Sequence, residues 1–228
     1  MAQRPIKVMR IIARLNVGGP AIHVISLTGL LREPDFESIL VCGHIDETEG
    51  DMQYLAEERG IEPVIIPTLG RDISLLRDIG TIWQLYRLIR RYRPVIVDTH
   101  TAKAGFVGRI AAWLARVPVR LHTFHGHVFH GYFGPRKTQL FLMLERLCAR
   151  LSSRIITISP GLRDELVNTY HIAPAAKFVV VPLGFDLAPL TARPPRASNP
   201  TRVVGIVGRL VPIKNHKLFL DAARLLLQ

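Results

Sequence analysis

The sequence predicts an α/β fold, a Rossmann-like parallel sheet flanked by helices, followed by a second Rossmann-like domain that is truncated. Two observations predict it. Short apolar runs alternate with segments of helical periodicity, which is typical of βα units, and a proline-rich break separates the last unit from the others. The chain has 228 residues, of which 48% are hydrophobic and 21% charged, so it can bury a sizeable core.

Apolar runs rich in β-branched residues predict seven strands in the first domain. They span residues 6–12, 38–43, 62–66, 94–99, 119–124, 154–158 and 178–181.

Apolar residues recur at the spacing of one helical face in residues 72–93, in 103–116 and from 135 onward. We expect these three stripes, Trp83 included, to face the sheet, whereas Arg109 falls outside its stripe. The stripes are Leu76, Ile79, Trp83 and Tyr86; Phe106, Ile110 and Leu114; and Leu140, Leu144, Leu147 and Leu151.

Residues 182–200 contain five prolines and no periodicity, which is typical of an interdomain linker. We therefore place the first domain at 1–181 and the start of the second at 201–228. The apolar run Val203–Val207 predicts a strand, followed by a turn and a helix. A single strand and helix cannot bury their apolar faces, so we expect the second domain to continue past Gln228.

The net charge of +12 indicates an anionic partner: nucleic acid, a lipid surface or a phosphorylated substrate. Lysine and arginine are scattered through every predicted helix, which disfavours a nucleic-acid site. No run of about 18 apolar residues predicts a membrane span, and the N-terminus has no signal-peptide pattern. Cys42 and Cys148 lie far apart in apolar segments, which favours two buried thiols and a reducing, cytoplasmic location.

The turn after the first strand, Asn16–Pro20, contains Gly18 and Gly19. Adjacent glycines allow close backbone approach, and the helix that follows supplies N–H donors for a phosphate. A purely structural role of these glycines stays open. The turn lacks the G-x-G-x-x-G pattern, which argues against a nicotinamide or flavin domain.

Polar residues follow the fourth strand, where doubly wound sheets bind ligands. His100 and Lys103 belong to this segment, Asp98–Gly105. A lysine at a helix start is unfavourable unless it faces an anion. A solvated lysine is the alternative.

A histidine-rich loop follows the fifth strand, and it contains His122, His125, His127 and His130. No cysteine or carboxylate lies among these histidines, and they do not share one face, so a metal site is disfavoured. Hydrogen bonds to a polyhydroxylated ligand, or acid–base chemistry, suit them better. We expect one or two of the four to be structural.

The turn Gly208–His216 carries two cations at a strand-to-helix junction, Arg209 and Lys214. A guanidinium and an ammonium there could neutralise a departing diphosphate. An exposed basic surface is the alternative.

In order and spacing, these segments resemble the retaining glycosyltransferases of family 4, which have the two-domain GT-B fold. The segments that carry the resemblance are NVGGPAIHV, HTAKAGFVGRIAA, HTFHGHVFHGYF, ISPGLRDEL, VPLGFDL and GRLVPIKNH. The resemblance implies a nucleotide-sugar donor, favouring UDP-sugars, and a polysaccharide or lipid-linked acceptor of the bacterial cell envelope. It also implies retained configuration, no obligatory metal or cofactor, and peripheral contact with the anionic inner face of the cell membrane.

The resemblance also implies roles for single residues. The donor diphosphate would be bound by Gly18, Gly19, Arg209 and Lys214. His125 would contact the donor sugar at the reacting centre and is the predicted catalytic residue. The acceptor side would contain His100, Lys103 and His127.

The family's E-x7-E glutamate pair belongs to the second domain and is expected past Gln228. We therefore expect the 228 residues alone not to transfer sugar. A UDP-sugar epimerase of similar architecture is the alternative enzyme, and a module that binds anionic surfaces is the alternative outside enzymes.

Overall fold

The structure is a computed structural model. It describes residues 4–32, 34–45, 50–70, 74–127, 129, 134–185, 187–191, 202–208, 210 and 214–226. The chain divides into two compact units, Met1–Phe185 and Asp186–Gln228, which we describe separately.

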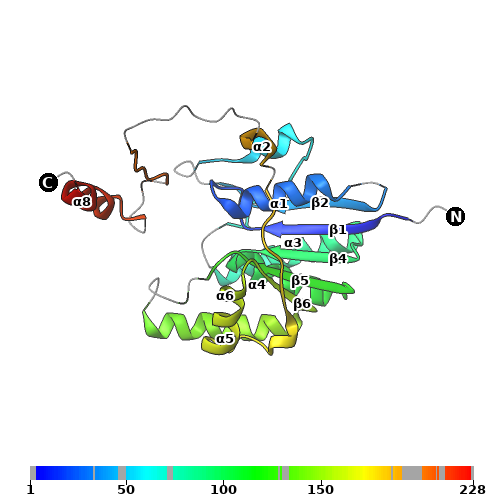
Figure 1. Cartoon of the computed structure of the whole chain (residues 1–228). Helices are drawn as coiled ribbons and strands as arrows, with labels where there is room; N and C mark the ends of the chain where they lie inside the picture. The colour runs from blue at the N-terminus through cyan, green and yellow to red at the C-terminus, as the bar shows by residue number, and fades with distance from the viewer. Residues whose placement is uncertain are drawn as a thin grey trace. The chain divides into compact units, whose positions relative to one another are not determined.

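Seven parallel strands among the described residues of the first unit form one sheet in the order β3-β2-β1-β4-β5-β6-β7 (Figure 1). The chain order reverses between β1 and β4, so this pair is the topological switch point of the sheet. The strands are β1 (Ile6–Ile12), β2 (Phe36–Cys42), β3 (Val64–Ile65), β4 (Ile96–His100), β5 (Val119–Phe124), β6 (Arg154–Thr157) and β7 (Phe178–Val180).

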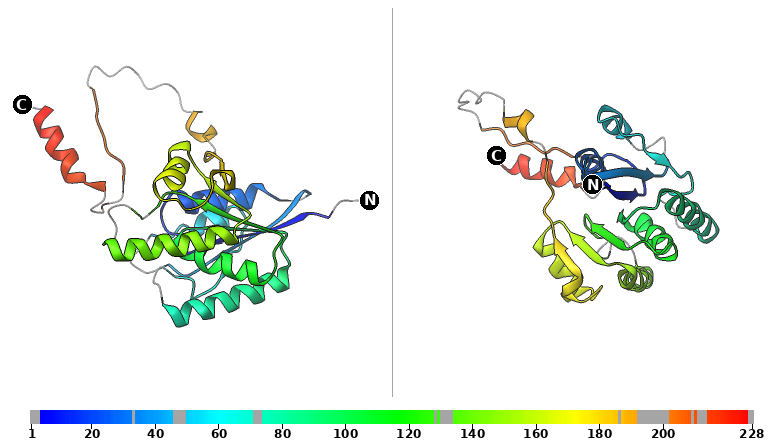
Figure 2. Two further views of the ribbon diagram at one scale, coloured as in Figure 1. Left: turned by 90° about the horizontal axis from the view of Figure 1, so that it is seen from below. Right: turned by 90° about the vertical axis from the view of Figure 1, so that its right-hand side faces the viewer.

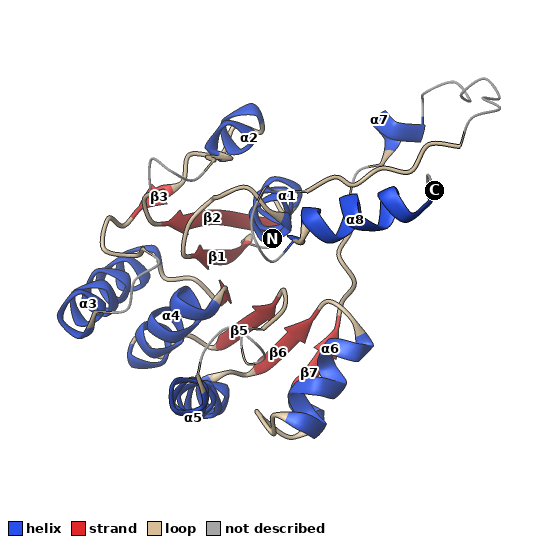
Figure 3. Ribbon diagram, turned by 90° about the vertical axis from the view of Figure 1, so that its left-hand side faces the viewer, coloured by secondary structure: helices blue, strands red, loops and turns tan. Residues whose placement is uncertain are grey.

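Helices cover both faces of the sheet. The first unit contains α1 (Gly19–Leu30), α2 (Gln53–Glu58), α3 (Leu75–Tyr92), α4 (Ala102–Leu114), α5 (Pro135–Leu151) and α6 (Pro160–Asp164), and the short turns η1 (Glu165–Thr169) and η2 (Ala175–Lys177). Helices α3, α4 and α5 lie on one face and α1, α2 and α6 on the other (Figure 3). Two further views show α3, α4 and α5 side by side (Figure 2).

The core has one apolar layer on each face of the sheet. Met9 and Ile11 of β1 pack with α3 and α4, whereas Ile12 packs with α1 and α2. This alternation follows from the two-residue period of a strand. No helix in the described part of the chain is both long and apolar enough to cross a membrane.

The prediction that the α3 stripe faces the sheet is wrong. Leu76 is 83% exposed and Trp83 59%, whereas Leu85 and Ile89 of the same helix are buried. Contacts on the inner face fix this rotation, because Thr81 Oγ1 donates to Thr68 Oγ1 at 2.7 Å and Asp78 pairs with Lys103 of α4. Apolar residues therefore lie on two sides of α3, and the set that contains Leu76 and Trp83 faces outward.

The stripes predicted for α4 and α5 are right only in part. Phe106 of the α4 stripe packs against the core, but Leu114 is exposed, and so are Leu140 and Leu147 of the α5 stripe. The most deeply buried side of α4 consists mostly of small residues, and Ala149 is buried in α5. Periodicity of large apolar residues does not detect such a face.

The second unit contains α7 (Ala188–Thr191) and α8 (His216–Leu226). The strand predicted at Val203–Val207 is not formed, because residues 202–208 pair with no strand, and Val203, Val204 and Val207 are exposed. A strand needs a neighbour to satisfy its backbone groups. No described residue of α8 is buried, which agrees with the expectation that one helix cannot cover its own apolar face.

Candidate functional site

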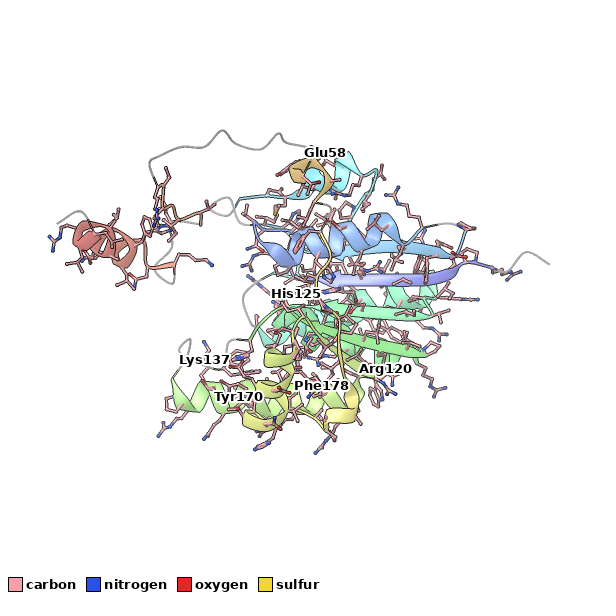
Figure 4. All side chains as sticks on the ribbon, in the orientation of Figure 1. Glu58, Arg120, His125, Lys137, Tyr170 and Phe178 are labelled. Carbon is pink, nitrogen blue, oxygen red and sulfur yellow. The ribbon has the colours of Figure 1, made fainter. Side chains whose placement is uncertain are left out.

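Three imidazoles converge at the carboxyl edge of the sheet, beside the switch point. His100 ends β4, His125 directly follows β5, and His23 lies in the first turns of α1. Their ring centroids are 5.1 to 5.9 Å apart. Figure 4 labels His125 at this end of the central strands. We call these three residues the histidine cluster.

A chain of polar contacts leads from the sheet into the histidine cluster. Asp98 Oδ2 lies 3.1 Å from His100 Nε2, and His100 Nδ1 lies 3.1 Å from His125 Nε2. The other carboxylate oxygen of Asp98 accepts from Thr123 Oγ1 at 3.1 Å. Because strand residues alternate between faces, Asp98, His100, Thr123 and His125 all point to the α1 side of the sheet.

Asp98 carries a negative charge at the start of this chain of contacts. Burial alone would raise the pKa of Asp98, but His100, Arg10 and the Thr123 hydroxyl hold it below its ordinary value. The carboxylate lies close to His100 Nε2, but the two atoms do not have hydrogen-bond geometry. In the tautomer in which His125 Nε2–H donates to His100 Nδ1, His125 Nδ1 is an acceptor. That nitrogen is buried and has no hydrogen-bond partner.

Burial keeps the other two imidazoles neutral. It lowers the pKa of His125 to about 3, with His100 and His23 adding to the effect. It lowers the pKa of His23 to about 4, with contributions from His100 and Arg10. Both rings therefore present a lone pair at neutral pH.

The backbone beside the cluster is strained. Thr101, between His100 and α4, has φ 67° and ψ 158°, in a region that residues other than glycine rarely adopt. Its hydroxyl oxygen accepts from the Ala13 amide at 3.4 Å, which links β4 to the end of β1. Such strain is concentrated at ligand sites in proteins.

The glycines of the first turn are not required by packing within the described chain. A Cβ on Gly19 would meet no atom within 4 Å, and one on Gly18 would meet only Pro20 at 3.6 Å. Neither glycine has the positive φ that would demand one. The space beside them at the start of α1 is therefore available to a ligand.

The glycines of the α4 segment have the opposite character. A Cβ on Gly105 would lie 2.5 Å from His122 Cε1, and one on Gly108 would lie 2.7 Å from Thr99 Cγ2. Both glycines therefore let α4 pack closely on the sheet. Lys103, at the start of α4, pairs with Asp78 of α3 at 3.0 Å, so the anion beside its ammonium in this structure belongs to the protein.

On the α4 side of β4 and β5 lies a second group of buried polar residues. His122 Nδ1 is 2.9 Å from Thr99 Oγ1, and Arg109 Nη1 is 2.7 Å from Glu145 Oε1. Burial, followed by the charge of Arg109, lowers the pKa of His122 well below its ordinary value. His122 is thus a structural histidine, as expected for part of the histidine-rich loop.

The remaining predicted residues lie elsewhere or outside the described residues. His127 contacts Glu165 at 2.9 Å and stacks on Phe129, and it does not join the histidine cluster. Lys214 is exposed and precedes α8. Arg209 and His130 lie outside the described residues.

Sequence reasoning missed His23, Arg10 and Thr123. Arg10, Asp98 and Thr123 could have been grouped by the two-residue period of their strands. His23 is a single histidine on a helix, and only the strand order brings it to His100 and His125.

The fold and site define a Rossmann-like α/β protein with a polar cluster at the switch point. Residues 17–189 match the profile of Glycosyltransferase Family 4, and the chain belongs to that family. The expected GT-B type of N-terminal domain is confirmed by its solved neighbours.

One curated relative is the Escherichia coli UDP-Gal:alpha-D-GlcNAc-diphosphoundecaprenol alpha-1,3-galactosyltransferase, 30% identical over 87% of this chain and 52% of the relative. A glycosyltransferase from Rickettsia africae is similar in fold, with a TM-score of 0.62 and 16% identity over 84% of this chain and 47% of its own. A Neisseria meningitidis UDP-GlcNAc 2-epimerase is also similar in fold, with a TM-score of 0.58 and 15% identity. The match covers 77% of this chain and 46% of the epimerase chain. The chain spans about half the length of the curated relatives it matches.

Proposed function

We propose that the chain is the acceptor-side part of a two-domain enzyme that transfers a sugar from a UDP-sugar to a lipid-linked or polysaccharide acceptor of the bacterial cell envelope. Membership of Glycosyltransferase Family 4 and the relative that acts on a diphosphoundecaprenol-linked sugar support this proposal. The similarity to an epimerase is one of fold alone and favours no second function.

The observation that carries the proposal is the acceptor nitrogen of His125. The contacts from Asp98 through His100 leave His125 Nδ1 buried, neutral and without a hydrogen-bond partner at the switch point. A sugar hydroxyl is a suitable donor to such a nitrogen. We assign to His125 the contact with the donor sugar at the reacting centre. We assign to His100 the orientation of the His125 ring.

The donor diphosphate would approach the open side of Gly18 and Gly19, where the N-terminus of α1 favours negative charge. Arg209 and Lys214 would stabilise the charge that develops on the leaving phosphate. We further propose that the transfer retains the anomeric configuration by front-face displacement. The leaving phosphate would help to deprotonate the acceptor hydroxyl, with no metal or other cofactor required.

We place the acceptor near His100, Lys103 and His127. Lys103 contributes only if its ammonium exchanges the contact with Asp78 for one with the acceptor. A lipid-linked acceptor also requires that the enzyme reach a membrane surface.

The outward stripe of α3 suits that requirement. Leu76, Ile79 and Trp83 are exposed along one line of the helix, and Arg87 and Arg90 continue the same line. Apolar residues beside arginines bind anionic lipid surfaces through burial and charge together. We propose that this stripe docks on the anionic cytoplasmic face of the cell membrane.

Sedimentation with vesicles tests the docking. We expect the chain to bind phosphatidylglycerol vesicles and to bind phosphatidylcholine vesicles weakly. Trp83→Ser should lower binding several-fold, and Tyr54→Ser, an equally exposed aromatic on α2, should not. Equal effects of the two substitutions would contradict the assignment of this surface.

A transfer assay tests the function. The two-domain enzyme should transfer radiolabelled sugar from one of several UDP-sugars to a diphosphoundecaprenol-linked acceptor, and the 228-residue chain alone should not. Epimerised UDP-sugar without transfer would refute the proposal.

A further inference from the structure

We propose that the histidine cluster is a binding site for a divalent transition metal of the Zn²⁺ type. His23, His100 and His125 each offer a ring nitrogen, and these three atoms lie within 4.8 Å of one another. Three imidazoles from separate elements are a common zinc donor set, with a fourth position taken by water or a ligand.

The first supporting observation is the hydrogen bonding of His23. Its Nδ1 is buried and has no hydrogen-bond partner. A buried polar atom without a partner is unfavourable, and a bound ion is one way to satisfy it. The His23 ring centroid lies 5.9 Å from that of His100 and 5.1 Å from that of His125, so a metal bound among the three rings would give this nitrogen a partner.

The second observation is the spacing of the other two rings. His100 Nδ1 and His125 Nε2 are 3.1 Å apart. Two nitrogens bound to one tetrahedral Zn²⁺ at about 2.0 to 2.1 Å would be about 3.3 Å apart. A metal can therefore replace the shared proton at nearly the same nitrogen spacing, provided that each ring tilts to point its lone pair at the ion. All three ring nitrogens lie within 4.8 Å of one another, so the distance between the most widely spaced pair must shorten by at most about 1.5 Å to reach the zinc spacing. Rotation of the half-buried His23 ring can supply this movement.

The third observation is the support of His100 by Asp98. The nitrogen of His100 that faces away from His125 lies 3.1 Å from Asp98 Oδ2, and Thr123 fixes the other carboxylate oxygen. A carboxylate behind a metal-bound histidine is the usual arrangement in zinc sites. The negative charge of Asp98 also offsets the positive charge of Arg10, which lowers the pKa of both Asp98 and His23.

The set differs from the four loop histidines for which the sequence disfavours a metal site. Of the four histidines in the loop after β5, only His125 takes part, and the other two ligands come from α1 and β4. The site does not depend on the proposed transfer. A metal bound there would occupy His125, so we expect it to compete with the donor sugar.

Binding of Zn²⁺ and Co²⁺ to the tag-free, chelator-treated 228-residue chain tests the proposal. We expect one ion per chain by titration calorimetry, and the intense visible absorption of four-coordinate Co²⁺. His23→Gln and His125→Gln should each weaken binding at least about tenfold, and Asp98→Asn should weaken it by about 10- to 100-fold. His127→Gln and His171→Gln, outside the cluster, should bind like the parent chain.

Absence of stoichiometric binding would overturn the proposal, as would unchanged affinity in His23→Gln. His100 is fully buried and its substitution can unfold the chain, so the decisive variant is His23→Gln on the half-buried side of α1. Loss of binding in His127→Gln or His171→Gln would place the ion elsewhere and would equally overturn it.

Discussion

Two groups of buried polar residues lie on opposite faces of β4 and β5, and they differ in charge and in which atoms their contacts leave open. On the α4 face, the charge of Arg109 lies against that of Glu145 at 2.7 Å and His122 lies against Thr99, so the charges are paired within the protein although Arg109 Nη2 has no hydrogen-bond partner. On the α1 face, the contacts from Asp98 end at the neutral ring of His125, whose Nδ1 has no partner. The same two strands thus build a structural group on one side and a candidate ligand site on the other.

The largest expected effect comes from breaking the structural group. Arg109→Met leaves Glu145 as a buried charge without its partner, which should lower the free energy of unfolding by about 3 to 5 kcal/mol. Urea denaturation measures it. The double variant Arg109→Met, Glu145→Met should recover most of the loss.

Lys217→Met is the matched control, because it breaks an ion pair with Asp221 that is exposed. Its effect should stay below about 1 kcal/mol. A loss in Arg109→Met as small as in this control would show that the pair does not stabilise the α4 face.

A pair of glycine substitutions separates the two faces more finely. Gly105→Ala drives a methyl group into His122 and should cost about 1 to 3 kcal/mol. Gly19→Ala meets no protein atom and should change stability by less than about 0.5 kcal/mol, while raising KM for the donor in the two-domain enzyme. Equal stability of both variants would contradict the distinction between packing and ligand glycines.

A smaller effect is expected from pH. The pKa of His122 is lower in the folded than in the unfolded chain, so the unfolded chain binds a proton first as the pH falls. Stability present above about pH 6.5 is therefore lost below it, by up to about 1.4 kcal/mol per pH unit. His122→Asn keeps a donor for Thr99 but does not titrate, so its unfolding free energy should change less between pH 6.5 and 5. Identical slopes for parent and variant would refute the assignment of His122 as buried and neutral.

The sequence was sufficient for the strands of the first unit, because short runs such as Ile6–Ile12 and Arg154–Thr157 are rich in β-branched residues and alternate with helical segments. It was not sufficient for helix orientation. Small residues such as Ala104 and Ala111 face the sheet in α4, and Trp83 of α3 faces outward. Hydrophobic periodicity weights large side chains, so it misses the small residues that α4 places against the sheet and cannot choose between the two apolar sides of α3.

For the site, the strand pattern predicted that His100 and the histidine-rich loop lie at the carboxyl edge of the sheet, and the family resemblance singled out His125 within that loop. It could not place His23 beside them, because that requires α1, β4 and β5 to meet at the switch point. The two-residue period already put His122 and His125 on opposite faces, but it could not tell which face carries the candidate site.

The central claim is that His125, presented by Asp98 and His100, contacts the donor sugar. Sugar transfer by the two-domain enzyme with His125→Ala tests it most directly, with His171→Ala, an exposed histidine outside the site, as the control. The claim predicts that kcat/KM falls by about 100-fold or more in His125→Ala and by less than about threefold in His171→Ala. Transfer by His125→Ala at a rate close to the parent enzyme would contradict it.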